Sequence, residues 1–349
     1  MKKIIIFMLT VGVLCVTACG KERVDNIKIH PILKKFTPPI QSFSINPSIQ
    51  NVVTGKRGTR LYIPPKAFDI DYDDLKKNKN FKVQLTEYID TFDFLTSGVS
   101  LRYHNPLTKR AEVFESAGMF KVTATYKGKK TKLKKNKGIT VEFPNVVPGE
   151  KFNVYRINSS GQWEYDGHNQ ESIPKRKSSS RFKMDVEIKR LNPVAYKRIV
   201  GVRKYVITSL TYYNFDYPRP ESACVKGLVK IDNQKKKRLF YQVYILPLKT
   251  RGYWRNHSSV KQFKVSYFNN TKVKLMILTS DGRIGKSRIF WTSPRFGHHK
   301  KKEGPHCYCK KSGKVIQFKK IDDSILKSRK KFMKYLGLKG DEYTVKRKK

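Results

Sequence analysis

The chain is poor in acidic residues. It carries 27 aspartate and glutamate residues against 75 lysine and arginine residues, a formal net charge of +48 over 349 residues. Self-repulsion of this size destabilises a compact chain, so an anionic partner is expected. The candidate partners are lipid phosphates, an acidic polysaccharide, nucleic acid and an acidic protein. A scattered, solvated charge with no specific partner is the alternative.

The chain also lacks a hydrophobic run long enough to cross a bilayer. The longest apolar run covers residues 4–16, follows two lysines and leads to Thr17-Ala18-Cys19. A hydrocarbon core of about 30 Å needs about 20 residues of helix. Basic residues, a short apolar segment and small residues before a cut are typical of a secretory signal peptide. Removal of residues 1–18 takes two lysines away and lowers the net charge from +48 to +46.

The end of this signal resembles the lipobox of bacterial lipoproteins, and an ordinary secretory signal that happens to contain a cysteine is the alternative. The resemblance implies that Cys19 is acylated, with palmitate among the chains, and becomes the first residue of the mature protein. It also implies a bacterial envelope protein held by lipid at the outer membrane or cell surface. Several acyl chains hold a protein firmly, whereas one chain holds it only reversibly.

Cysteine is scarce, and lipid attachment at Cys19 reduces the number of cysteines that can form a disulfide. Cys15 leaves with the signal and Cys19 carries the lipid, so Cys224, Cys307 and Cys309 remain. Three thiols in an oxidising compartment suggest one disulfide and one free cysteine. Cys307 and Cys309, two residues apart, point to the same face of an extended chain. We therefore expect Cys224 to pair with Cys307 or Cys309, and the sequence leaves the choice open.

Metal-ligand residue types gather in one segment only, at His298, His299, His306, Cys307 and Cys309. Imidazole and thiolate suit zinc or copper. The spacing matches no closed zinc motif, and the lysines at 300–302 would repel a cation. We expect a loop with a disulfide here and no cofactor, with a metal site as the alternative.

Catalytic motifs are absent as well: the sequence has no Gly-x-Ser-x-Gly, P-loop or dinucleotide-binding glycine pattern. Glycan hydrolysis needs two carboxylates facing each other across a cleft. The acidic concentrations are residues 69–74 and the group Glu87, Asp90 and Asp93. The first lacks the central glycine and distal glutamate of an EF-hand, which favours a solvated turn. We expect a non-catalytic protein, with a carbohydrate hydrolase of the cell envelope as an alternative.

What the sequence does contain is β-strand patterning. Residues 81–88 alternate apolar and polar side chains, and residues 139–143 end at Pro144. A hairpin is predicted over residues 151–165, with Trp163 in its second strand. Several further strands between residues 205 and 277, separated by turns, favour an immunoglobulin-like antiparallel sandwich. Asp322 or Asp323 is expected to begin a C-terminal helix that Gly337 ends.

Four segments of the first half follow one another in an order that resembles a known domain. They are residues 58–68, the strand that ends at Glu87-Tyr88, residues 115–120 and residues 139–144. The order is similar to a domain of bacterial surface lipoproteins and, distantly, to the ZU-five β-sandwich of zonula-occludens proteins and netrin receptors. The resemblance covers residues 45–170 and implies an interaction or scaffold module. It carries over no catalytic residue.

The predicted fold class is all-β, with two antiparallel β-sandwich domains, the second immunoglobulin-like, and a short C-terminal helix. The predicted organisation is a signal peptide (1–18), a lipid-anchored tether (19–45), a ZU-five-like sandwich with its following hairpin (46–170), a linker (171–197), an immunoglobulin-like sandwich (198–320), and a basic helix and tail (321–349).

Basic residues interleaved with aromatic residues are the candidate contacts for an anionic ligand. One group lies on a predicted hairpin end and the other places ring faces beside cations, a mixture that suits sugars or bases. They are Lys127, Lys129, Lys130, Lys132, Lys134, Lys135, Arg251, Tyr253, Trp254 and Arg255. Trp254 anchoring a loop against the core is an equally good interpretation.

These residues lead to a prediction of function. The expected protein is a binding or scaffold module for an anionic component of the envelope. A subunit of an envelope machine that contacts an acidic protein is an alternative. Nucleic-acid binding would depend steeply on salt, and it is not expected of an exported protein. The oligomeric state is not predicted.

Overall fold

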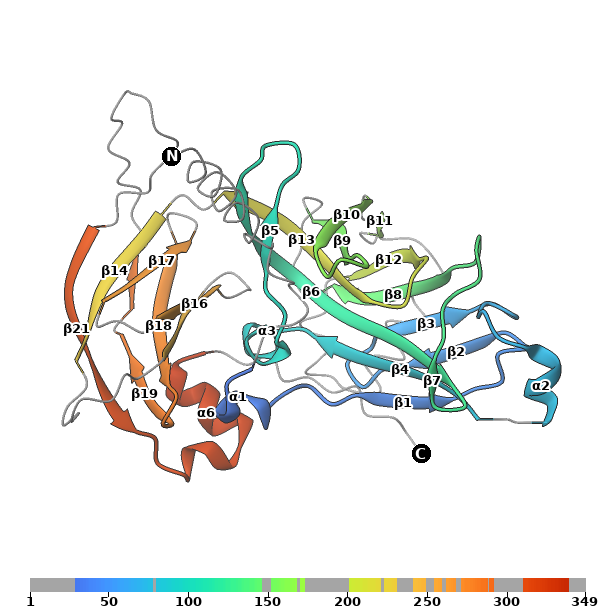
Figure 1. Ribbon diagram of the computed structural model, residues 1–349, viewed down its shortest axis with the longest axis horizontal. Coiled ribbons are helices and arrows are strands. Elements are labelled where there is room, and N and C mark those ends of the chain that lie inside the picture. The colour runs from blue at the N-terminus through green and yellow to red at the C-terminus, as the bar shows by residue number, and fades with distance from the viewer. Residues whose placement is uncertain are drawn as a thin grey trace, which may run out of the picture.

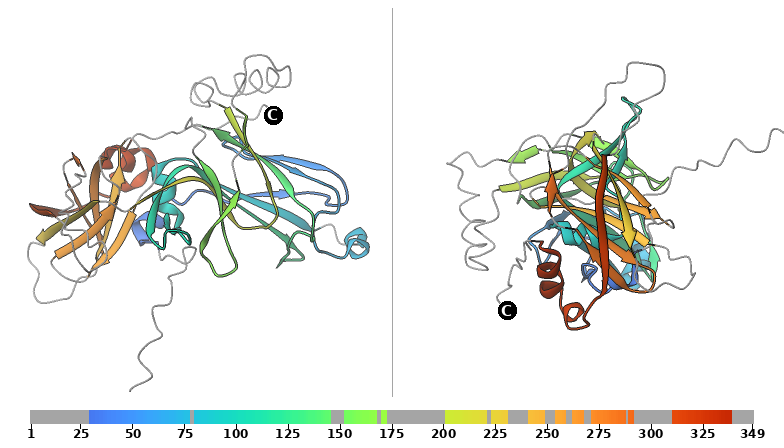
Figure 2. Two further views of the ribbon diagram at one scale, coloured as in Figure 1. Left: turned by 90° about the horizontal axis from the view of Figure 1, so that it is seen from above. Right: turned by 90° about the vertical axis from the view of Figure 1, so that its left-hand side faces the viewer.

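The structure, a computed structural model, is an all-β protein with a short C-terminal helix, which confirms the predicted all-β class and its terminal helix. It describes residues 29–77, 80–145, 152–167, 170–172, 201–220, 223–230, 241–248, 254–258, 262–267, 271–287, 289–291 and 310–338. Two β units lie side by side, with three helices at their junction (Figures 1 and 2). None of the helices in these ranges is long and apolar enough to cross a bilayer.

The first unit is a sandwich of two sheets. One sheet has the order β1 (Gln41–Ser44), β4 (Phe81–Tyr88), β6 (Ala111–Tyr126), β13 (Tyr212–Pro220), β9 (Asn153–Ile157), β10 (Trp163–Gly167), with β5 (Arg102–His104) and β7 (Lys129–Lys130) also paired to β6. The other has the order β11 (Gln170–Ser172), β12 (Gly201–Ile207), β8 (Ile139–Asn145), β3 (Arg60–Ile63), β2 (Asn51–Thr54). The predicted hairpin with Trp163 in its second strand is confirmed as β9 and β10.

Alternate residues of the two sheets form one apolar core. Val83 and Leu85 of β4 are fully buried, as are Leu61 of β3 and Val141 and Phe143 of β8. This is the side-chain period of two expected for strands buried on one face. The helix α2 (Tyr72–Lys77) lies at the end of this sandwich that is remote from the second unit (Figure 1).

The second unit is a single curled sheet. Its order is β16 (Trp254–Ser258), β15 (Tyr241–Pro247), β18 (Lys272–Thr279), β19 (Arg283–Lys286), β21 (Lys310–Lys320), β14 (Ala223–Lys230), β17 (Gln262–Tyr267), with β20 (Phe290–Trp291) paired to β18. The end strands β16 and β17 approach each other, so the sheet turns back on itself. All described pairs are antiparallel except β14 and β21, which run parallel.

The division between the units differs from the predicted boundary at residue 198. Strand β12 pairs with β8, and β13 pairs with β6 and β9, so residues 201–220 belong to the first sandwich. Ile207, Tyr213 and Phe215 are buried in its core. Alternating patterning shows that a segment is a strand but not which sheet it joins, because pairing partners far apart in sequence leave no local signal.

The predicted tether also extends too far. Residues 31–44 are packed against the folded body: α1 (Pro31–Lys34) buries Leu33 completely, and β1 pairs with β4 along its length. Pro31 stands in the first turn of α1, where its missing N–H costs no helical hydrogen bond. The packed chain therefore begins well before the predicted boundary at residue 45.

The C-terminal helix ends where the sequence predicts but begins later. Gly337 ends α6 (Arg329–Leu336) in the left-handed conformation, with φ of 71°. The helix starts after Ser328, whose hydroxyl accepts a hydrogen bond from the backbone N–H of Lys331, and a 3₁₀ turn (η1, Ile325–Lys327) precedes it. Ser328 is extended, and this interrupts the helix predicted from residue 323.

The junction between the units has an apolar core of its own, here called the junction core. It contains buried residues of the first sandwich, of strands β15, β18 and β19, and of the three helices α1, α3 (Thr91–Ser97) and α6. Phe36, Phe92 and Phe332 lie at its centre, with ring centroids 5.3 to 5.7 Å apart. The apolar face of α6 is therefore packed against its own protein.

Candidate functional site

Three acidic side chains at the end of β4 organise the junction. Asp90 is the N-cap of α3 and forms a capping box with Asp93: each carboxylate accepts a hydrogen bond from the other residue's backbone N–H, at 2.8 and 3.2 Å. The backbone N–H of Ile89 also donates to Asp93, at 2.8 Å. Gly98 ends α3 in the left-handed conformation. The local sequence thus holds two carboxylates in place before any distant contact is made.

Glu87 holds the turn between β2 and β3. Its Oε2 accepts hydrogen bonds from the backbone N–H of Arg57 and from Gln41 Nε2, and its Oε1 accepts one from the backbone N–H of Thr59. Gly55 is needed at the start of this turn, because a Cβ there would stand 2.6 Å from Glu87 Oε2. The clamped turn fixes the two basic residues at its tip, residues 56 and 57.

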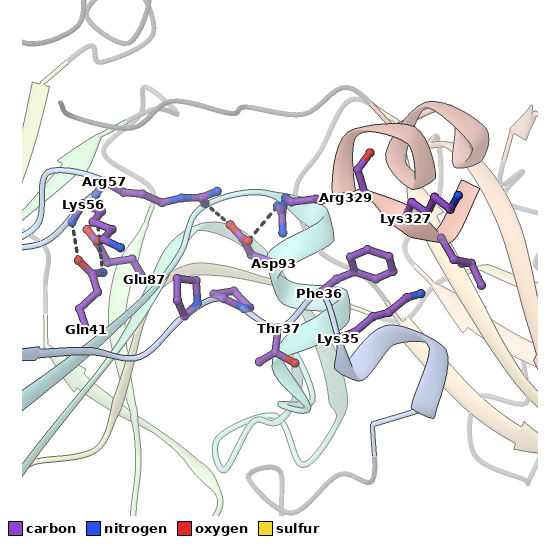
Figure 3. Close-up of a pocket in the computed structure, with 14 residues that line it drawn as sticks. Lys35, Phe36, Thr37, Gln41, Lys56, Arg57, Glu87, Asp93, Lys327 and Arg329 are labelled. Atoms are coloured by element: carbon purple, nitrogen blue, oxygen red, sulfur yellow. Dashed lines mark hydrogen bonds and ion pairs between the residues drawn. The ribbon is translucent and has the colours of Figure 1, made fainter. Parts of the chain in front are cut away.

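Two arginines from distant parts of the chain meet on Asp93. Arg57 forms an ion pair with Asp93 Oδ2, and Arg329 Nη2 lies 2.9 Å from Asp93 Oδ1. The same Nη2 donates to both oxygens of Asp90 at 2.8 Å, and the Arg329 guanidinium stands 4.7 Å from the centre of the Phe92 ring. Figure 3 shows the arginines approaching Asp93 from opposite sides.

Burial sets the ionisation of Asp93, whose side chain is 1 % exposed. Loss of water raises the pKa of the Asp93 carboxyl, and the neighbouring Asp90 carboxylate raises it further. Arg57 and Arg329 lower it but do not cancel the effect of burial. The two arginines therefore serve mainly to make a buried acidic pair tolerable, and they link the first sandwich to α6.

A cavity of about 440 Å³, here called the junction pocket, opens beside this cluster (Figure 3). Its walls come from the segment after α1, the β2–β3 turn, α3, η1 and the start of α6. Cationic side chains outnumber carboxylates in it by five to two. The lining residues are Lys35, Phe36, Thr37, Pro38, Pro39, Gln41, Lys56, Arg57, Glu87, Asp93, Leu326, Lys327, Ser328 and Arg329.

The two carboxylates that line the pocket are buried and already bonded. Glu87 and Asp93 are both nearly inaccessible, and each accepts structural hydrogen bonds or ion pairs. A glycoside hydrolase needs two carboxylates exposed to the scissile bond. The described residues contain no group of three His, Cys, Asp or Glu side chains that could hold a metal ion. The accessible polar groups of the lining are mainly lysines.

The first group of predicted contact residues lies elsewhere, on the hairpin of β6 and β7 and the chain that follows it. Lys129, Lys130, Lys132 and Lys135 are exposed there, as the sequence predicts for a hairpin end. Lys127 is exposed but forms an ion pair with Asp74 at 2.5 Å.

This hairpin and the helices α1, α3 and α6 beside the junction pocket lie at opposite ends of the first sandwich (Figure 1). The hairpin joins β4 at Phe81 and the pocket is lined by Glu87, a separation along β4 of roughly 20 Å at the rise of a strand. Lys134, with its Nζ 4.9 Å from the centre of the Tyr72 ring, belongs to the hairpin end. The two basic surfaces are therefore separate.

The remaining predicted residues fall mostly outside the described part of the chain. Trp254 and Arg255 lie in β16 and Cys224 lies in β14, where only the course of the backbone is described. Val225, next to Cys224, pairs with Lys310 of β21. The residues outside the described ranges are Cys19, Arg251, Tyr253, His298, His299, His306, Cys307 and Cys309.

Sequence reasoning found the acidic cluster but not the cations around it. Asp90 and Asp93 were considered only as carboxylates for hydrolysis, although Asp90-x-x-Asp93 followed by Gly98 is a capping signal from which α3 could have been predicted. Arg329 gives no such signal, because 239 residues separate it from Asp90. Its role depends on how the C-terminal segment packs.

Comparison with known proteins finds no relative: no protein family, no curated protein and no solved structure matches the chain. The interpretation of the site therefore rests on its own residues.

Proposed function

We propose that the protein is a non-catalytic binding module for an anionic component of the bacterial cell envelope, held at the membrane by lipid on Cys19. The junction pocket is the observation that carries this proposal. Its two carboxylates are committed to structural bonds, whereas Lys35, Lys56 and Lys327 are exposed.

The charge of the whole chain supports the same function. A net charge of +48 raises the local concentration of anions and speeds their association, an effect that salt screens. A fixed anionic partner near the anchor would also relieve the self-repulsion of the folded chain. A scaffold or interaction role is what the resemblance to the ZU-five sandwich implies for residues 45–170.

The exposed hairpin lysines favour a macromolecular partner as a second kind of contact. Lys129, Lys130, Lys132 and Lys135 project from one end of the sandwich, where an acidic polysaccharide or an acidic protein of an envelope machine could reach them. Each lysine at such a surface contributes little alone, and a set of them contributes together.

Binding of the full chain to immobilised dextran sulfate, measured over a range of salt concentrations, tests the proposed function. We expect the logarithm of the affinity to fall linearly with the logarithm of the salt concentration. A variant with Lys129, Lys130, Lys132 and Lys135 changed to glutamate should bind more weakly and with a shallower slope. Absence of binding by the folded wild-type chain at low salt would contradict the proposal.

A further inference from the structure

We infer that the junction pocket binds a phosphomonoester carried on an organic group about the size of a sugar ring. This inference rests on the proposed function, anion binding by this chain, and narrows it at one site. It is carried by four properties of the pocket: its charge, its donor types, its volume and its apolar wall.

The charge of the lining calls for a multivalent anion. Five cationic and two carboxylate side chains line the pocket, and Asp90, paired with Arg329, adds a third carboxylate, which leaves an excess of two positive charges. A phosphomonoester carries about −1.5 to −2 charges at neutral pH and offers three acceptor oxygens. A single carboxylate, with one charge, would leave half of that excess uncompensated. The excess therefore favours a phosphomonoester over a simple carboxylic acid.

The donor types point the same way. Asp93 engages one terminal nitrogen of each arginine, Nη1 of Arg57 and Nη2 of Arg329, which holds both guanidinium groups toward the buried carboxylates. Lys35, Lys56 and Lys327 also line the pocket, and a lysine ammonium group acts as a point charge that binds phosphate without a required plane.

The three lysines that line the pocket come from separate, rigidly held segments. The backbone N–H of Lys56 donates to Gln41 Oε1 at 2.6 Å, within the turn that Glu87 clamps. Lys35 follows α1, and Lys327 ends η1 directly before the N-cap of α6. Figure 3 shows Lys56 on one side of Asp93, and Lys35 and Lys327 on the other. A site assembled from fixed backbone pays less ordering entropy on binding than one formed by mobile loops.

The volume and the apolar wall indicate that the phosphate is attached to an organic group. The pocket, at about 440 Å³, lies within the range typical of sites for small organic ligands, about 300–1,000 Å³. A bare phosphate ion would leave most of that space to water. Phe36, Pro38, Pro39 and Leu326 provide a wall without charge, against which the C–H face of a ring can pack.

Isothermal titration calorimetry on the full chain in detergent tests the inference, with glucose 6-phosphate as the probe. We expect saturable binding of glucose 6-phosphate, binding of inorganic phosphate at least about tenfold weaker, and no measurable binding of glucose. Equal affinities for inorganic phosphate and glucose 6-phosphate would overturn the assignment of an organic ligand.

The pocket variant for this test is Lys56→Ala/Lys327→Ala, which leaves Arg329 and its carboxylates untouched. We expect it to bind glucose 6-phosphate about tenfold or more weakly, the loss typical of charge-assisted hydrogen bonds. The matched control is Lys129→Ala/Lys130→Ala, which removes the same charge at the hairpin and should bind like the wild type. An unaltered melting temperature shows that the pocket variant is folded, and Lys56→Arg/Lys327→Arg should restore part of the affinity.

A third arm distinguishes the source of the phosphate, with phosphatidylcholine vesicles that contain or lack phosphatidic acid. Binding to phosphatidic acid that weakens in the pocket variant supports a lipid headgroup as the source. Binding of glucose 6-phosphate alone supports a soluble or glycan phosphate. Failure of the folded wild type to bind glucose 6-phosphate, or an unchanged affinity in the pocket variant, would overturn the inference. If dextran sulfate still binds in that case, the proposed function stands and only this inference fails.

Discussion

At the scale of single residues, the burial of the Asp216 carboxyl in the first sandwich lowers the stability of the folded state. It follows a bulge in β13, is completely buried, and has no hydrogen-bond partner for either carboxylate oxygen among the described residues. Nearby, Ser116 Oγ donates to Asn214 Oδ1 at 2.6 Å, and Asn214 Nδ2 has no hydrogen-bond partner among the described residues. Burial raises the pKa of Asp216 well above its ordinary value, against a smaller lowering by Ser116 and Asn214.

This raised pKa makes stability depend on pH. Between the ordinary pKa of 3.8 and the raised value, the folded state binds a proton that the unfolded state has lost, so stability falls as the pH rises through that window. We expect Asp216→Asn to raise the melting temperature at pH 8 by about 2–4 °C. Thermal unfolding of both proteins from pH 5 to pH 8 measures this. A variant that is less stable than the wild type at pH 8 would contradict the assignment.

At the scale of elements, α1 connects the two units through its N-cap. His30 Nδ1 accepts a hydrogen bond from the backbone N–H of Ile32, so Nε2 carries the proton and donates to the carbonyl oxygen of Thr279, at 3.0 Å, at the end of β18. Burial lowers the pKa of His30, and the hydrogen bond to Thr279 only partly opposes this. Protonation of Nδ1 would remove the acceptor that caps α1.

Because the folded pKa of His30 is lowered, the unfolded state binds the proton first. Its contribution to stability is complete above the ordinary pKa of 6.5 and is lost as the pH falls through the lowered value. We expect His30→Gln to cost about 1 kcal/mol at pH 7.5 and to lose less stability than the wild type between pH 7 and pH 5. Urea unfolding at several pH values measures both effects. The exposed His104 offers the control: His104→Gln should leave the pH profile unchanged, and an equal effect there would refute the role of His30.

At the scale of the whole molecule, the junction core makes the two units one body. Buried residues of both units and of α1, α3 and α6 share it, and Arg329 adds bonds from α6 to Asp90 and Asp93. An interface that resembles a domain core gives little reason for independent unfolding. The pocket proposed to bind an anion exists only while α6 stays in place.

Phe332, fully buried between Phe36 and Phe92, tests this coupling. We expect a single calorimetric unfolding transition for the wild type. We expect Phe332→Ala to lower the stability by about 3–5 kcal/mol and to separate the transition into two. Leu107→Ala, at a side chain that is 90 % exposed, is the control and should leave the melting curve unchanged. Two transitions already present in the wild type would show that the units are not coupled.

The predicted parts of the fold are those with a local cause. Residues 81–88 form a strand because alternate side chains are buried, and Gly337 ends α6 because glycine adopts a positive φ without strain. The predicted domain boundary was wrong because strand pairing has no local cause. Tyr212 of β13 pairs with Lys121 of β6, which lies far earlier in the sequence. At the site, Glu87, Asp90 and Asp93 were visible as acidic residues, but the clamp that Glu87 forms depends on the backbone N–H groups of Arg57 and Thr59, and the link from Asp90 to α6 depends on Arg329.

The sequence by itself determined that this protein is strongly basic, rich in β-strand patterning, and without a Gly-x-Ser-x-Gly, P-loop or dinucleotide-binding glycine motif. These properties follow from composition, short-range periodicity and local motifs. Only the tertiary structure decided which sheet β12 and β13 join, that α6 packs on its own protein, and that lysines of three distant segments share one pocket with a buried acidic cluster. The reason is physical: long-range pairing and burial depend on complementary surfaces that no single stretch of sequence contains.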